Sequence, residues 1–245
     1  MRLGREPHDP VAVAATPPHV FGSALAPAKV DRTACKVFPG LYNNDTYGDC
    51  TCVALTNYAR CIAALNGFEL TVDAHAPLKL YSNVLDNPPN LQATNGAVAL
   101  DVLHYQEQNG FDIGPQMLVG RFGRVNLTRN DLALGIDRLG GGYWGVLLRA
   151  ADMDAATGGS KFWDLTPNDG AVEGGHMINA FDYTGLGDSD MVRVGTWAMW
   201  FYATWRWVLN RIEEAYAIAW RQLARTDGTF AFNPGLDADQ LVAEA

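Results

Sequence analysis

A cysteine and a histidine are the residues whose surroundings best suit chemistry. Cys50 follows the polar, turn-rich segment 43–49 and opens a run with helical apolar spacing. A thiol in the first turn of a helix faces the positive end of the helix dipole, which stabilises the thiolate. Asp49 acts in the opposite direction, because an adjacent carboxylate disfavours a second anion. On this signal alone, a buried cysteine that fills space remains the simpler interpretation.

His176 follows Gly174 and Gly175 at the start of an apolar segment that predicts a strand. The two glycines leave room for the imidazole to project into a cleft. A thiol and an imidazole placed in this way act as nucleophile and general base in thiol hydrolases. The alternative is a histidine that is only part of the core.

The elements that must position these residues follow from apolar periodicity and capping signals. A mostly buried helix is predicted over residues 50–65, with Asp49 as N-cap and Gly67 after its end. Two further helices are predicted over 96–108 and 128–139. Strands are predicted over 143–148, 176–183, 190–195 and 215–220, whereas 203–212 is ambiguous between helix and strand.

Helices that come first and strands that come later favour an α+β fold. We expect a helical lobe over about 41–142 and a β lobe over about 143–245. Residues 1–40 are rich in proline, which predicts an extended arm that packs across the following domain. A disordered tail is the alternative for this segment.

The order and spacing of several motifs resemble the papain-like (C1-type) cysteine peptidase superfamily over roughly residues 40–220. Asn44-x5-Cys50 resembles the family's Gln-x5-Cys stretch, and the residues from Gly174 to Tyr183 resemble its Gly-His-Ala-Val-x-x-x-Gly-Tyr strand. The resemblance implies a papain-like fold with an N-terminal helical lobe, a C-terminal antiparallel β lobe and a cleft between them. It implies roles for four residues: Cys50 as nucleophile, His176 as general base, Asn44 as oxyanion-hole donor and Trp197 as the indole that shields the site.

Two departures from the family pattern bear on activity. Asn44 has the carboxamide of the usual glutamine with one methylene less reach. Gly195 stands where the family has the asparagine of Asn-Ser-Trp-Gly, so no side chain from residues 194–198 is expected to hold the imidazole. Asn179 is expected to face away from His176, because alternate strand residues point to opposite faces. Asp164 and Asp182 stay open as alternative partners.

The sequence therefore supports two functions. The first is a papain-like thiol hydrolase, a peptidase or amidase, that acts on a peptide or protein and is weakened by the missing third residue. The second follows from the segments around Asn44 and Glu214, which are similar to papain-like proteins of tailed phages and prophages. It is a virion structural protein, a capsid decoration or tail-associated component, that binds other virion proteins and has little or no activity. Gly195 favours the second function, and the intact pair favours the first.

Composition limits the remaining classes. The chain has 245 residues, 48% of them hydrophobic, and a net charge of −9, which suits a globular protein rather than a binder of nucleic acid or anionic membrane. No CxxC pair, phosphate loop or dinucleotide fingerprint is present, so neither a metal nor a cofactor is expected. The first ten residues lack a continuous apolar core, so we expect no signal peptide and a location in the host cytoplasm or the virion.

Overall fold

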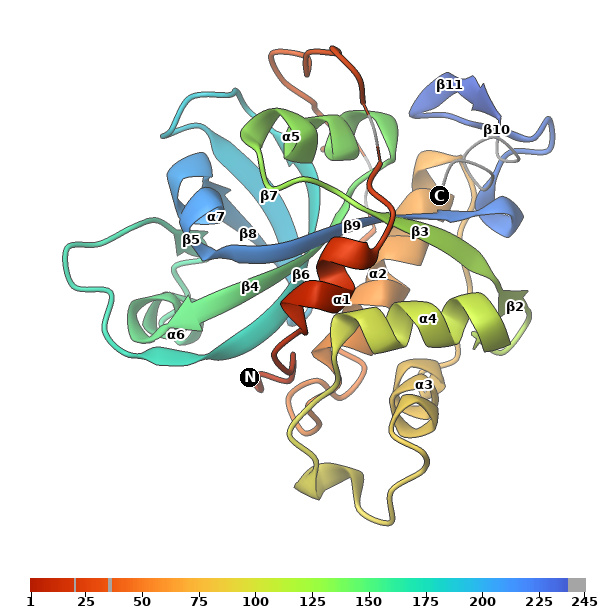
Figure 1. Cartoon of the computed structure of the whole chain (residues 1–245), viewed down its shortest axis with the longest axis horizontal. Helices are drawn as coiled ribbons and strands as arrows, with labels where there is room; N and C mark the ends of the chain where they lie inside the picture. The colour runs from red at the N-terminus through yellow and green to blue at the C-terminus, as the bar shows by residue number, and fades with distance from the viewer. Residues whose placement is uncertain (20, 35–36, 238–245) are drawn as a thin grey trace.

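The computed structural model describes residues 1–19, 21–34 and 37–237 (Figure 1). Its central feature is a seven-stranded sheet with the strand order β3-β9-β4-β6-β7-β8-β5. The strands are β3 (Gly120–Arg124), β4 (Gly142–Arg149), β5 (Phe162–Trp163), β6 (Val172–Tyr183), β7 (Met191–Thr196), β8 (Met199–Thr204) and β9 (Ile212–Trp220). Neighbouring strands are antiparallel, as predicted, except at one edge, where β5 and β8 are parallel.

Helices pack around this sheet, and the α+β prediction is confirmed. Figure 1 shows one group beside the sheet and the first residues of the chain between that group and the sheet. The group consists of α2 (Cys50–Leu65), α3 (Ala76–Val84) and α4 (Ala99–Asn109). The other helices are α1 (Pro10–Ala15), α5 (Arg129–Arg138), α6 (Ala150–Thr157), α7 (Trp205–Arg211), η1 (Leu91–Ala93) and η2 (Arg221–Leu223).

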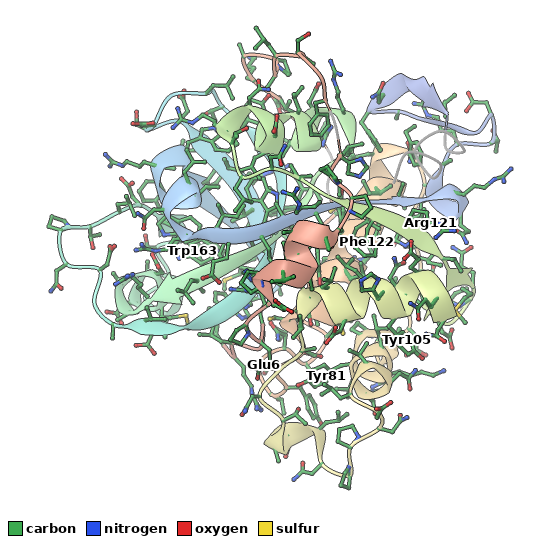
Figure 2. The ribbon with its side chains drawn as sticks, in the orientation of Figure 1. Glu6, Tyr81, Tyr105, Arg121, Phe122 and Trp163 are labelled. Carbon is green, nitrogen blue, oxygen red and sulfur yellow. The ribbon has the colours of Figure 1, made fainter. Side chains whose placement is uncertain are left out.

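Two small hairpins complete the described chain. They are formed by β1 (Phe111–Asp112) with β2 (Met117–Leu118), and by β10 (Thr229–Phe230) with β11 (Asn233–Asp237). Figure 2 gives the side-chain view of the same arrangement: Tyr81 and Tyr105 lie on α3 and α4, Trp163 lies on the sheet side, and Glu6 lies between them.

Helix α2 has the bounds that the sequence predicts, and it is buried on nearly every side. Leu55, Tyr58 and Ile62 are at most 1% exposed. The Tyr58 hydroxyl donates to the carbonyls of Leu139 and Gly141 at 3.1 Å each, which satisfies its polar end inside the core. Burial of each large apolar side chain stabilises the fold by about 1.5–3 kcal/mol. The N-terminus of α2, which carries Cys50, is therefore held by a rigid core element.

Several elements differ from the sequence expectation. The ambiguous segment 203–212 divides into the end of β8 and helix α7, where the Thr204 hydroxyl accepts the N-cap bond from the Trp207 amide. Pro10, expected to interrupt regular structure, opens α1. Helices α3 and α6 were not predicted. Strand β3 lies before the predicted lobe boundary but pairs with β9 in the main sheet, and the division of the chain near residue 142 stays a prediction.

Candidate active site

The N-terminus of α2 places Cys50 at the bottom of a closed site. Cys50 is the first residue of the helix and is 1% exposed. Its sulfur accepts backbone hydrogen bonds from Met177, the residue directly after His176, and from Gly4. Burial raises the pKa of the Cys50 thiol to about 12, and those bonds only partly oppose it. Desolvation therefore outweighs the helix dipole, and in this state Cys50 is a neutral thiol.

His176 lies on β6, in register with Val146 of β4. The imidazole is fully buried and stacks on the Trp197 indole, with ring centroids 4.1 Å apart and an interplanar angle of 17°. Burial, and then the positive charge of Arg5, lower the pKa of His176 to about 3, so the ring is neutral. Strand β6 thus brings the main chain of Met177, the residue after His176, to the Cys50 sulfur, while Trp197 covers one face of the imidazole.

The hydroxyl of Thr196 holds the far side of the imidazole. Thr196 Oγ1 lies 2.5 Å from His176 Nε2. The expectation that no side chain from residues 194–198 holds the ring is therefore wrong. The family motif places the third group at Gly195. The contact from the adjacent Thr196 depends instead on the register between β6 and β7, which the motif does not specify.

The other partners that were left open do not contact the imidazole. Asp164 accepts from the Thr204 hydroxyl at 2.7 Å and pairs with Arg206. Asp182 lies 2.6 Å from an Arg193 nitrogen. Asn179 is fully buried between Tyr143 and Gly195 on the neighbouring strands, and its amide has no hydrogen-bond partner among the described residues.

Asn44 and Asp49 form a buried polar pair in the loop before α2. The Asn44 amide donates to the Tyr47 carbonyl at 3.3 Å and to Asp49 Oδ1 at 3.0 Å. Both of its hydrogens are thus used within the loop, and its predicted role as an oxyanion donor stays a prediction. Asp49 occupies the N-cap position without capping the helix, and burial raises the pKa of its carboxyl to about 7.

The N-terminal segment passes directly over Cys50. Gly4 accepts from the Ala97 amide at 3.0 Å, the Glu6 amide donates to the Ala97 carbonyl at 3.1 Å, and the Arg5 amide donates to the Gly175 carbonyl at 3.2 Å. A Cβ at Gly4 would lie 2.1 Å from the Gly48 carbonyl oxygen. Only glycine allows such a close approach. Residues 3–7, which we call the covering segment, therefore fill the space between α2 and β6.

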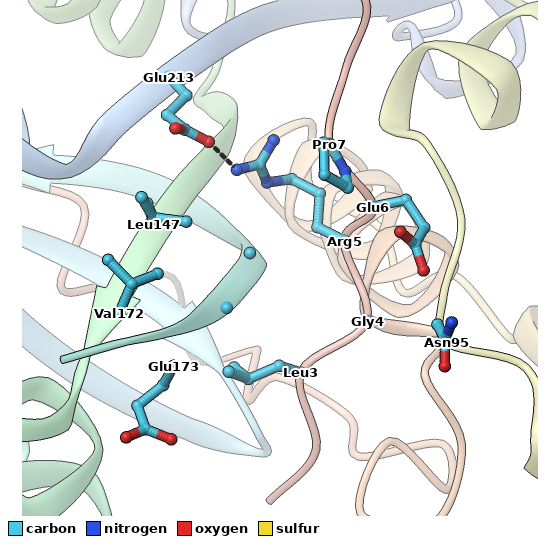
Figure 3. Close-up of a pocket in the computed structure, with 12 residues that line it drawn as sticks. Leu3, Gly4, Arg5, Glu6, Pro7, Asn95, Leu147, Val172, Glu173 and Glu213 are labelled. Carbon is cyan, nitrogen blue, oxygen red and sulfur yellow. Dashed lines mark hydrogen bonds and ion pairs between the residues drawn. The ribbon is translucent and has the colours of Figure 1, made fainter.

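A buried ion pair anchors the covering segment. The Arg5 guanidinium pairs with Glu213 and lies 2.7 Å from Glu214 Oε1, and the side chains of Arg5 and Glu214 are 1% and 0% exposed. Figure 3 shows the Arg5 side chain pointing at Glu213, whereas Glu6 points the other way. A groove of about 480 Å³ remains beside the segment, lined among others by Leu3, Leu147 and Val172.

The described residues contain no cluster of three or more histidine, cysteine or acidic side chains arranged to hold a metal ion. In the same ranges, none of the helices combines the length and apolar character needed to cross a membrane.

Several solved structures that are similar to this chain share one fold. Xylellain, a cysteine protease from Xylella fastidiosa, superposes with a TM-score of 0.65 at 15% identity, over 88% of this chain and 95% of that one. Procathepsin B S9 from Trypanosoma congolense gives 0.60 at 11% identity, over 88% and 85% of the two chains. Procathepsin L 3 of Tenebrio molitor gives 0.57 at 13% identity, over 82% and 73%. No protein-family model and no curated protein sequence matches the chain.

Proposed function

We propose that this chain, which has the fold of the papain-like cysteine proteases, is a thiol hydrolase of peptides in a form closed by its own N-terminal segment. One observation carries the proposal. The thiol of Cys50 stands at the N-terminus of a rigid helix, against the main chain of the strand that bears His176. This placement supports a nucleophile and a base that come from elements far apart in the sequence.

Catalysis requires the Cys50 thiol and the His176 imidazole to be solvated, so that the thiolate and the imidazolium can form. When the covering segment leaves, desolvation decreases, and the causes that raise the Cys50 pKa and lower the His176 pKa decrease with it. The thiol proton then passes to the imidazole, and the sulfur attacks the carbonyl carbon of the substrate. The imidazolium returns the proton to the leaving amine as the C–N bond breaks, and water hydrolyses the thioester.

The oxyanion of the tetrahedral intermediate is stabilised by the Cys50 backbone N–H. The first N–H groups of a helix have no partner within the helix, which leaves this donor available. Asn44 joins it only after its amide turns away from Tyr47 and Asp49, its partners in the closed form.

The test uses the full chain in an opened form. The Arg5→Ala variant removes the cation that balances the buried carboxylate of Glu214, and solvation of that carboxylate favours departure of the segment. We expect Arg5→Ala to raise the rate of iodoacetamide labelling at Cys50 by at least about 10-fold and to hydrolyse fluorescein-labelled casein.

The controls are made in the Arg5→Ala background. Adding Cys50→Ala or His176→Ala is expected to abolish hydrolysis. Adding Cys52→Ala, a buried cysteine on the same helix, is expected to leave it unchanged. Hydrolysis that persists without Cys50, or an opened Cys50 that reacts no faster than a free thiol, would reject the proposed function. The virion role and the cellular location stay predictions.

A further inference from the structure

The hydrogen bond between His176 Nε2 and Thr196 Oγ1 determines which ring nitrogen is free. Both residues are buried, and the two atoms are 2.5 Å apart. His176 Nδ1 has no hydrogen-bond partner among the described residues. Nδ1 is the ring nitrogen nearer to the main chain, and the Cys50 sulfur lies against the main chain of the next residue, Met177. The free nitrogen is therefore the one that can still take a proton from a second group.

A hydroxyl can act in either direction, and the two directions have opposite consequences. If Nε2 carries the proton, it donates to Oγ1, and the lone pair of Nδ1 remains available to accept a proton. If Oγ1 donates to Nε2 instead, Nδ1 carries the proton and is left as a buried donor with no acceptor. In the first direction the hydroxyl keeps its own hydrogen, which can rotate toward another acceptor. The Nδ1–H of the second direction cannot turn, because the imidazole is stacked on Trp197, so the first direction is favoured.

The turn after Thr196 also fixes the plane of the His176 imidazole, because it carries the Trp197 indole that stacks on that ring. Thr196 pairs with Met199 across the two-residue turn formed by Trp197 and Ala198. Both turn residues have positive φ, 45° and 58°. Backbone strain of this kind costs on the order of 1 kcal/mol or more per residue and persists where the surrounding structure requires it. Here the strained turn places the indole parallel to the imidazole and keeps the hydroxyl in line with Nε2.

We propose that Thr196 is the positioning residue of His176: its hydroxyl accepts a hydrogen bond from Nε2–H and thereby leaves the lone pair of Nδ1 free to accept a proton. It thereby replaces, from the adjacent position, the carboxamide that is absent at Gly195. The inference rests on the proposed function for its catalytic consequence, but the tautomer itself does not depend on activity.

The first measurement is the tautomer of His176 in the full chain, from ¹⁵N chemical shifts of the imidazole. We expect the Nε2–H form in the unmodified protein and in Thr196→Ser, which keeps the hydroxyl. In Thr196→Val, which has the same shape without it, we expect a mixture of tautomers. An Nδ1–H form in the unmodified protein overturns the inference, as does a Thr196→Val protein whose tautomer is unchanged.

The second measurement is kinetic and uses the Arg5→Ala background. We expect Thr196→Val to lower kcat about 100-fold with little change in KM, and Thr196→Ser to retain kcat within several-fold. Equal kcat in Thr196→Val and its parent overturns the catalytic part. If no variant hydrolyses substrate although the tautomer shifts as expected, the proposed function fails while the positioning role of Thr196 stands.

Discussion

At the scale of single residues, the site combines a thiol, an imidazole and a carboxyl group whose pKa values are all shifted toward the neutral form in the closed state. Burial is the dominant cause for each: it raises the pKa of Cys50 and of Asp49 and lowers that of His176. Asp49 also accepts a single amide hydrogen from Asn44, while its second oxygen has no partner among the described residues. Asp49 is therefore a source of instability once it ionises.

Asp49 makes the stability of the closed form fall with increasing pH. Its folded pKa, about 7, is raised above the ordinary 3.8. The unfolded chain thus loses this proton first, and the free energy of unfolding decreases between about pH 4 and pH 7. We expect Asp49→Asn to increase the free energy of unfolding at pH 8 by about 4 kcal/mol and to change it little at pH 4.

Urea denaturation at both pH values measures this effect. Asp45→Asn, in the same loop but exposed, is the matched control and is expected to change neither value appreciably. An Asp49→Asn gain that is equal at pH 4 and pH 8 would contradict the titration of Asp49 as its origin.

Individual residues were predicted from sequence to different degrees. Cys50, His176 and Trp197 lie within short contiguous motifs, so their positions could be proposed without coordinates. Thr196 could not be assigned, because its role depends on the pairing of β6 with β7, which no local motif specifies. The direction of the Asn44 amide is likewise set by the fold of its loop and not by its place in the motif.

At the scale of elements, the hairpin of β7 and β8 is the least relaxed part of the site. A two-residue connection with positive φ at both positions usually contains glycine or asparagine, but this chain has Trp197 and Ala198. The exposed Ala198 contributes only a methyl group, so its strain can be removed separately from the indole.

We expect Ala198→Gly to increase the free energy of unfolding by about 0.5–1 kcal/mol, because glycine adopts this backbone conformation without steric cost. The control is Ala155→Gly in the middle of α6, where glycine is expected to lower stability by about 1 kcal/mol. Thermal unfolding of both variants checks the pair. A loss of stability in Ala198→Gly would show that the turn is not strained.

Elements with strong local signals were predicted best. Helix α2 has an apolar run and a glycine after its end, and α5 has its Thr128 cap, which accepts from the Asp131 amide. Helix α7 has a comparable capping residue in Thr204. The tryptophan-rich sequence after it fits a strand as well as a helix, so the cap alone did not predict α7. Strand β5 has only two residues and owes its existence to pairing with β8, so no periodicity could have indicated it.

At the scale of the whole molecule, the covering segment joins the two sides of the site. Arg5 is separated from Glu213 and Glu214 by 208 and 209 residues. Proline content predicted an arm, but the surface that it crosses depends on this distant pairing and on the close approach of Gly4. Such contacts are outside the reach of local sequence patterns.

A synthetic peptide of residues 1–9 is expected to inhibit the Arg5→Ala protein by occupying the same site. The same peptide with alanine at position 5 is expected to bind about 30-fold more weakly or worse, because Glu214 then stays buried without a cation. Replacement of Glu6 by glutamine in the peptide is the control, since its side chain points away from the carboxylates (Figure 3). Equal inhibition by all three peptides would contradict anchoring through Arg5.

The covering segment also sets how reversible the closed form is. As part of the same chain, residues 3–7 are present at their site at an effective concentration on the order of millimolar, whatever the dilution of the protein. A single cut in the chain after α1 would make the same contacts bimolecular. The severed piece would then be lost at low protein concentration and would rebind at high concentration. Cleavage of one peptide bond would thereby make the closed form depend on protein concentration, so that dilution would expose the site.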